Sequence, residues 1–101
     1  MSKATSTSAR RVLRVLKILK GHSLRGLSNG DVAKALGESP VNVTRALQAL
    51  AEEGMVTQLD TGRWAHSVAL LQIAQAHANE MAGAQDRIME LNRRILTGSQ
   101  N

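Results

Sequence analysis

The segment from Asp31 to Leu47, DVAKALGESPVNVTRAL, constrains the fold more than any other part of the chain. It places the small residue Ala33, then Gly37, then the medium-sized apolar residue Val43 at helical spacing. A small residue allows two helices to cross closely, and glycine tolerates the positive φ of a sharp turn. We therefore predict two helices joined by a tight turn, the second of which projects outward and can enter a DNA major groove.

Local capping signals delimit these two helices. Ser28 or Asn29 is expected to cap the first, and Gly37 stops it. Ser39 followed by Pro40 begins the second, because a capping hydroxyl precedes a residue whose missing N–H costs nothing at the first helical position. This second helix is expected over residues 40–53. Its predicted apolar face consists of Val43, Ala46, Leu47 and Leu50.

The remaining pattern adds a helix before this pair, and a hairpin and a helical tail after it. The first helix should begin near Ser8, with an apolar stripe. Two glycines mark a loop at 21–28, where Leu24 and Leu27 are expected to anchor the chain to the core. Strands are expected at 55–59 and 63–66 around the turn Asp60-Thr61-Gly62. The stripe of the first helix consists of Val12, Val15, Leu16 and Leu19.

The predicted fold class is therefore mainly α with a small β-hairpin wing, a winged helix-turn-helix domain over residues 9–66. Residues 1–8 are expected to form a flexible N-terminal arm. Residues 67–96 are expected to form a C-terminal helical segment in which Gly83 is the weak point, and residues 97–101 are expected to fray.

Composition narrows the function classes. Thirteen Lys and Arg against eight Asp and Glu give a net charge of +5, which favours an anionic partner. There is no Cys, and Trp64 is the only aromatic residue, so thiol chemistry and base-stacking RNA modules are excluded. His22, His66 and His77 lack metal-ligand spacing, so we expect no catalytic residue, cofactor or metal. No membrane segment is apparent, and a cytoplasmic protein, nucleoid-associated when bound to DNA, is expected.

Candidate DNA contacts follow from the predicted orientation of the second helix of the pair. Arginine pairs with guanine, glutamine with adenine, and threonine meets the thymine methyl. A solvated amphipathic face is the alternative interpretation. The candidate base contacts are Val41, Asn42, Thr44, Arg45 and Gln48, and the candidate backbone contacts are Ser39, Arg10, Arg11, Arg14 and Lys17.

The hairpin turn supplies the candidate wing contacts Thr61 and Arg63. Arginine in this position fits phosphate or a narrow minor groove. The alternative is a surface ion pair between Arg63 and Asp60.

The helical tail carries a heptad-like seam. Such a seam lets two helices pack along their length, so we predict a homodimer. Alternatively the tail folds back onto its own domain, which we expect for residues 68–76. The predicted dimer-interface residues are Met81, Ile88, Leu91 and Ile95.

The run from Ser8 to Ala74 resembles the N-terminal winged helix of IclR-type bacterial transcription regulators. The matching phrases are LSNGDVAKALG, VTRALQALAEEGMV and GRWAHS. The resemblance implies a transcriptional regulator, which we expect to be a repressor, with residues 40–53 as its recognition helix. The family's large effector-binding domain does not follow here, so we expect a stand-alone DNA-binding unit with no evident small-molecule effector. The rival hypothesis is a protein-interaction module that binds a host or phage regulatory protein.

Overall fold

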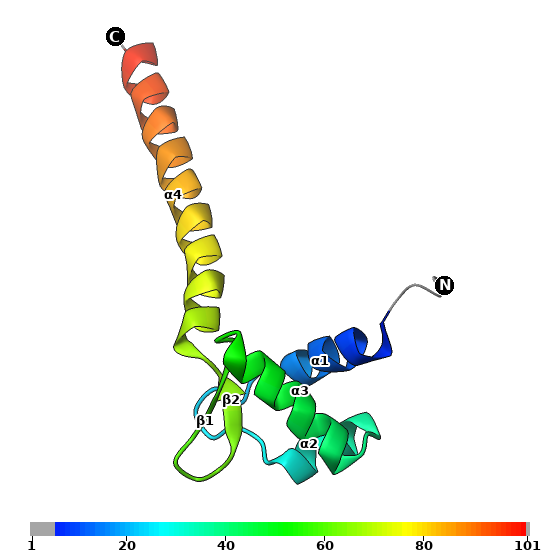
Figure 1. Ribbon diagram of the computed structural model, residues 1–101. Helices are drawn as coiled ribbons and strands as arrows, with labels where there is room; N and C mark the ends of the chain where they lie inside the picture. Colours follow the sequence, from blue (N-terminus) through cyan, green and yellow to red (C-terminus); the bar gives the residue numbers. More distant parts are fainter. Residues whose placement is uncertain (1–5, 101) are drawn as a thin grey trace. The chain divides into compact units, whose positions relative to one another are not determined.

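The computed structural model describes residues 6–100, which form five secondary-structure elements in one compact unit and most of a sixth in another (Figure 1). The first unit extends to Leu71 and the second begins at Gln72. The elements are α1 (Thr7–Ile18), α2 (Asn29–Leu36), α3 (Pro40–Glu52), β1 (Val56–Gln58), β2 (Trp64–His66) and α4 (Val68–Ser99). Three helices, a hairpin and a long helix confirm the predicted winged helix-turn-helix fold.

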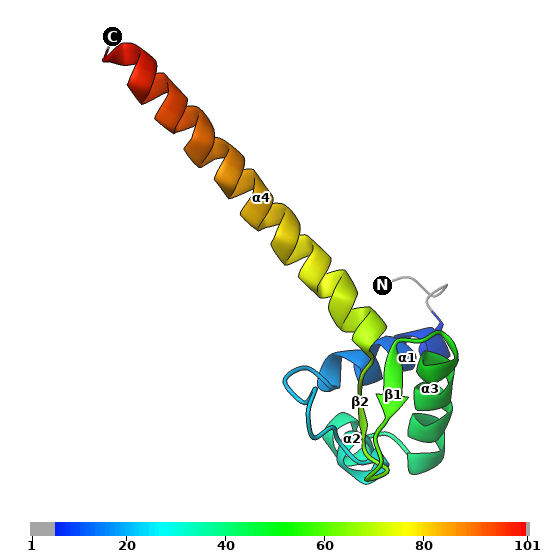
Figure 2. The same ribbon diagram turned by 90° about the vertical axis from the view of Figure 1, so that its left-hand side faces the viewer.

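The core lies where α1, α2 and α3 meet, and the first strand of the hairpin closes one side (Figure 2). The predicted apolar face of α3 is confirmed, since all four of its residues are buried. The predicted stripe of α1 is also confirmed: Val15 and Leu19 are fully buried, and Val12 and Leu16 pack against the core. The largest fully buried side chains are Leu19, Leu47, Val15, Val32 and Val43.

The tight turn between α2 and α3 forms as predicted. Gly37 takes a left-handed conformation with φ 67°, and its N–H donates to the carbonyl of Ala33. Ala33 is only 6% exposed, as close helix crossing requires. Ser39 caps α3, accepting a hydrogen bond from the Asn42 N–H at 3.2 Å. The turn at Gly37 and the Ser39 cap thus end α2 and begin α3 with only three residues between the two helices.

The hairpin pairs Val56 with His66 and Gln58 with Trp64, in strands shorter than predicted. A third segment joins it, because Leu27 and Trp64 exchange two backbone hydrogen bonds of 2.8 and 2.7 Å. Gly26 is required beside this bridge, since a Cβ there would lie 2.5 Å from the Trp64 carbonyl oxygen. The loop that the sequence indicated at 21–28 thus extends the wing sheet.

Leu24 and Leu27 behave differently from each other. Leu27 packs against the core as predicted, but the prediction for Leu24 is wrong, because that side chain is 93% exposed. Backbone pairing with Trp64 fixes Leu27, whereas Leu24 lies before the paired segment and has no such constraint.

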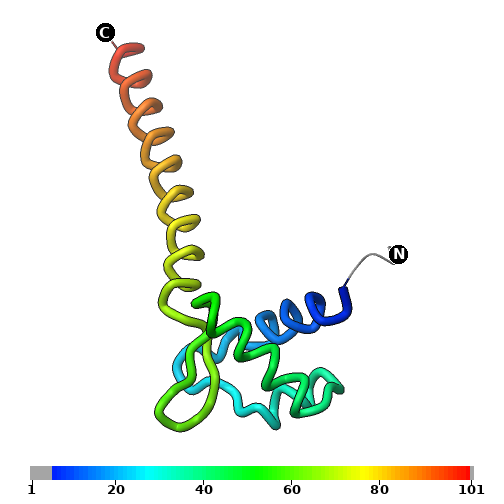
Figure 3. The backbone as a smooth tube through the Cα atoms, viewed as in Figure 1, coloured from blue at the N-terminus to red at the C-terminus, as the bar shows by residue number. Residues whose placement is uncertain are grey.

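The ends of α1 and α4 correct the predicted boundaries. Helix α1 begins at Thr7 because the Ser6 hydroxyl caps it, so Thr7 and Ser8 are helical; residues 1–5 of the predicted arm lie outside the described residues. Helix α4 continues through Gly83 without a break and ends at Ser99 rather than near Leu96 (Figure 3). Within residues 6–100 no helix is long and apolar enough to cross a membrane.

Candidate nucleic-acid interface

The outward face of α3 presents most of the predicted base-contacting residues to solvent. Because Val43 and Leu47 point into the core, residues on the opposite side of the helix are left exposed. Val41 is 60% exposed, and Asn42 is half-buried at the edge. The exposed candidates are Val41, Thr44, Arg45 and Gln48.

Arg45 and Gln48 occupy one helical turn of this face and carry long polar side chains. Arg45 forms no ion pair within the described residues, so its guanidinium is available to a partner. Guanidinium and amide groups are the two side-chain groups best suited to bidentate contacts with purine edges. The geometry of this face is therefore that of a helix able to read a major groove.

Thr44 is held by a residue that sequence analysis did not single out as a contact. Asn29, the first residue of α2, donates through Nδ2 to Thr44 Oγ1 at 2.7 Å and to the Pro40 carbonyl oxygen at 3.3 Å. The Thr44 hydroxyl in turn donates to the Pro40 carbonyl at 3.0 Å. The hydroxyl is thus engaged within the protein, which leaves the methyl group of Thr44 for an apolar base contact. The sequence indicated Asn29 only as an alternative cap to Ser28, which is the residue that caps α2, and gave no sign of its bond to Thr44, 15 residues away.

The two arginines of α1 that face the α2–α3 turn are engaged with it. Arg11 Nε lies 2.8 Å from Glu38 Oε1, and Arg14 Nη1 lies 3.7 Å from Glu38 Oε2. Arg14 Nη2 also donates to the Leu36 carbonyl at 3.3 Å. These contacts tie α1 to the turn before α3 and offset part of the positive charge. Arg10 and Lys17, both exposed, form no ion pair within the described residues.

Ser39 stands at the N-terminus of α3, where helix amides suit an anion. Its hydroxyl accepts the capping hydrogen bond from Asn42, so the hydroxyl proton can donate to a phosphate oxygen. The predicted backbone contacts are therefore divided between free groups and engaged ones. Arg10, Lys17 and Ser39 are exposed and can still contact a phosphate, whereas Arg11 is only 20% exposed.

Arg63 of the hairpin pairs with a different acid from the one that sequence analysis considered. Its Nη2 lies 3.7 Å from Asp31 Oδ2, so Asp60 is not its partner. Hydrogen bonds from the Ser28 N–H and hydroxyl lower the pKa of Asp31, and the charges of Arg63 and Lys34 lower it further. Thr61, the other wing candidate, is exposed beside the turn at Gly62.

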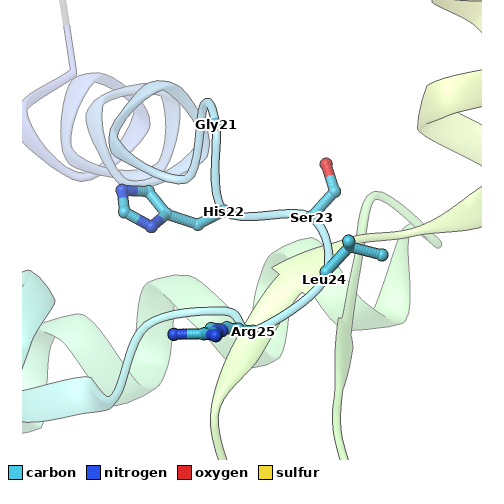
Figure 4. A pocket seen from close by; sticks show the side chains of 5 residues that line it. All are labelled: Gly21, His22, Ser23, Leu24 and Arg25. Atoms are coloured by element: carbon cyan, nitrogen blue, oxygen red, sulfur yellow. The ribbon is translucent and has the colours of Figure 1, made fainter.

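The loop before the Leu27 bridge is exposed throughout residues 21–25. Residues 21–25 line a shallow hollow, with the side chains of His22, Ser23, Leu24 and Arg25 spread around it (Figure 4). Arg25 also shares a second hollow with Leu59, Thr61 and Arg63 of the hairpin. Loop and wing therefore form one continuous surface.

Helix α4 keeps its apolar side chains in solvent. The four predicted interface residues recur at spacings of seven, three and four, and no residue of α4 is buried. A helix with an uncovered apolar stripe can associate with another helix. The exposed fractions are 46% for Met81, 59% for Ile88, 54% for Leu91 and 57% for Ile95.

The histidines form no metal centre in the part of the chain that the structure describes. Among residues 6–100, no group of three or more His, Asp or Glu side chains could hold a metal ion. His66 is half-buried, and its Nε2 lies 2.7 Å from the Leu16 carbonyl oxygen. Its role is to join the second strand to α1.

A capped three-helix unit with an outward third helix and a hairpin defines a winged helix-turn-helix, a class of DNA-binding domain. The family model for the IclR helix-turn-helix domain matches residues 8–60. The chain therefore belongs to the IclR helix-turn-helix family. No curated protein matches the sequence.

Solved structures share the fold at low sequence identity. An IclR family transcriptional regulator from Brucella abortus superposes with a TM-score of 0.64 and 22% identity, covering 74% of this chain and 29% of that one. A cysteine-to-serine mutant of Lactococcus lactis ZitR gives 0.51 and 21%, covering 93% and 66%. S. aureus MepR bound to ethidium bromide gives 0.51 and 16%, covering 99% and 81%. The chain thus spans less than a third of the length of the Brucella regulator.

Proposed function

We propose that the protein is a sequence-specific double-stranded-DNA-binding transcriptional regulator that acts as a homodimeric repressor in the cytoplasm, on the nucleoid. Helix α3 enters the major groove and the wing lies on the adjacent backbone or minor groove. The single observation that carries the proposal is the face of α3, which exposes Arg45 and Gln48 while its opposite face closes the core.

The distribution of charge supports this orientation. Through residue 20 the chain has six bases and no acid, whereas residues 51–101 have four bases and six acids. Phosphate neutralisation uses positive charge on the DNA-binding part of a protein and releases counterions. The charge therefore favours DNA as the partner of the first unit.

Each candidate takes a defined role. Arg45 and Gln48 read base edges, with Val41, Asn42 and the methyl group of Thr44 beside them. Exposed groups at the helix starts and on α1 hold the phosphates. Those backbone contacts are Ser39, Arg10 and Lys17, with Arg11 and Arg14 contributing through their orientation of the α2–α3 turn.

The homodimer rests on α4. One short recognition helix makes few contacts, and a second copy doubles them while raising the effective concentration of the second half-site. The uncovered stripe of Met81, Ile88, Leu91 and Ile95 supplies the surface for that association. We propose no small-molecule effector.

The test is selection of bound sequences from a random duplex pool, followed by titration of the selected site over a range of salt. Wild-type protein should enrich a short motif, and its affinity should fall steeply with salt. Arg45→Ala should cost about 1–3 kcal/mol in specific binding and relax preference at one base position. Arg94→Ala, which removes the same charge from α4, serves as the matched control. Unchanged affinity and preference in Arg45→Ala would reject the reading role.

A protein-interaction module is the second candidate, and the exposed apolar Val41 on the outward face favours it. A winged helix that binds a host or phage regulatory protein needs such a residue on its contact face. Duplex binding that is absent, or unchanged from low to moderate salt, would favour this candidate over the first.

A further inference from the structure

The side chain of Arg63 braces the loop before α2. Its Nε donates to the Arg25 carbonyl oxygen at 3.0 Å, and its Nη2 donates to the Gly26 carbonyl oxygen at 2.9 Å. A longer bond of 3.3 Å joins Nε to the Gly26 oxygen. One edge of the planar guanidinium thus donates hydrogen bonds to two consecutive carbonyl oxygens, a geometry that a lysine cannot reproduce.

The positive charge of the Arg63 side chain is also partly neutralised by a nearby carboxylate. Asp31 Oδ2 lies 3.7 Å from Arg63 Nη2, and the Asp31 side chain is itself half exposed. An arginine paired with a carboxylate presents less net charge to a phosphate than a free one. Arg63 is therefore occupied both by hydrogen bonds and by its ion pair.

Arg25 has the opposite properties. It is exposed, and within residues 6–100 its side chain forms no ion pair or hydrogen bond. Figure 4 shows the Arg25 side chain apart from the other labelled side chains. Its backbone, in contrast, is fixed, because the Arg63 guanidinium holds its carbonyl and the next two residues lead into the Leu27–Trp64 bridge. A rigid backbone with a free charged side chain is suited to an anionic partner.

The position of Arg25 places that free charge on the wing surface. Arg25 lines a hollow with Leu59, Thr61 and Arg63, all of the hairpin. Asp60, the acid in the wing turn, is exposed and pairs with no base among the described residues, so a neighbouring positive charge is needed for this surface to attract DNA.

We propose that Arg25 binds a backbone phosphate of the duplex beside the wing, and that Arg63 is a positioning residue that holds Arg25 in place. The assignment rests on the proposed DNA-binding function. The phosphate contact that the sequence predicted for Arg63 is thus assigned to Arg25, in the loop between α1 and α2.

The experiment measures duplex affinity against salt, together with thermal unfolding, for wild type and four variants. Arg25→Ala should lower the salt slope by about 1.8, because each protomer of the homodimer loses one phosphate contact, and the Tm should stay unchanged. Arg25→Lys keeps a positive charge and should restore most of the slope. Arg94→Ala is the matched control and should leave both readouts unchanged.

Arg63→Lys separates the two roles of that residue. If Arg63 holds the loop through its guanidinium hydrogen bonds, neither alanine nor lysine can replace it. Arg63→Lys should therefore lower both the Tm and the salt slope. If Arg63 contacts phosphate itself, Arg63→Lys should keep the slope close to wild type, which would overturn the assignment.

The outcomes also separate this assignment from the proposed function. Salt-sensitive duplex binding by wild type with an unchanged slope in Arg25→Ala refutes the role of Arg25 and leaves the DNA-binding function standing. Wild-type protein that binds no duplex DNA refutes both.

Discussion

The two units of the chain differ in how far their apolar side chains are buried. The winged-helix unit has an apolar core in which five side chains, among them Leu19 and Leu47, have no exposed surface. Helix α4 has no buried residue, and its larger apolar side chains are about half exposed. The first unit satisfies its apolar surface internally, whereas α4 leaves its own uncovered.

This difference suggests that the winged helix is stabilised by folding of a single chain, whereas α4 is stabilised by association with another chain. An isolated helix gains little from propensity alone, and most helical stability in proteins comes from packing of an apolar face. The winged helix has that packing within one chain. We therefore infer that α4 obtains it from a second copy, and the substitutions below test this division.

The largest effect is expected in the core. Leu47→Ala removes a fully buried side chain where all three helices meet, and should lower the free energy of unfolding by about 2–5 kcal/mol. Urea denaturation followed by circular dichroism and by the fluorescence of Trp64 measures it. Val41→Ala, on the exposed side of the same helix, should change stability by no more than about 0.5 kcal/mol. Equal effects of the two changes would contradict the placement of the core.

A second large effect is expected in α4, but on association rather than folding. Ile88→Asp places an unpaired charge in the apolar stripe, so the protein should become monomeric and lose roughly 100-fold in affinity for a two-half-site duplex. The Tm of the winged helix, measured at low concentration, should stay unchanged. Sedimentation velocity and binding titrations report the two effects.

Asn79→Asp is the matched control for that change, since it adds the same charge while keeping an acceptor for Gln75. It should remain dimeric. Truncation after Gly83 should reproduce Ile88→Asp. A truncated chain that stays dimeric with full affinity would place the interface on the first unit instead.

A smaller effect is expected at the start of α2, where capping hydrogen bonds of Ser28 stabilise the first turn. Ser28→Ala removes the capping hydroxyl and should cost about 0.5–2 kcal/mol. Because folding lowers the pKa of Asp31, the contribution of its carboxylate to stability is complete above the unfolded-state pKa of about 3.8. That contribution is lost as pH falls through the lower folded-state value.

The pH dependence can be isolated with Asp31→Asn. Its stability deficit relative to wild type should be largest near neutral pH and shrink on acidification. Self-association through the apolar stripe of α4 should not follow this profile. A deficit that is constant from pH 7 to the acid limit would show that the Asp31 charge contributes nothing to the cap.

The smallest effect is expected in the wing turn. Asp60→Asn removes an exposed acid that forms no ion pair among the described residues, so duplex affinity should rise slightly, more at low salt than at high salt. Stability should stay unchanged. A fall in affinity would mean that Asp60 takes part in recognition.

Local signals in the sequence determined the helices of the first unit and their order. Ser28 and Ser39 with Pro40 mark where α2 and α3 begin, and Gly37 marks the turn, because caps and turns depend on residues only a few positions apart. The buried faces were equally predictable, since helical periodicity places Val43 and Leu47 on one side. The continuity of α4 was harder to predict, because the tendency of Gly83 to break a helix depends on its surroundings.

Pairings between distant residues were decided only by the tertiary structure. The bridge between Leu27 and Trp64, the bond from Asn29 to Thr44, and the contacts of Glu38 with α1 each join residues with no periodic relation in the chain. The same holds for Arg63, whose guanidinium lies against the carbonyl of Arg25, 38 positions earlier. Sequence pattern shows which residue types face solvent, but which charges are free and which are paired depends on long-range contacts that only the folded chain brings together.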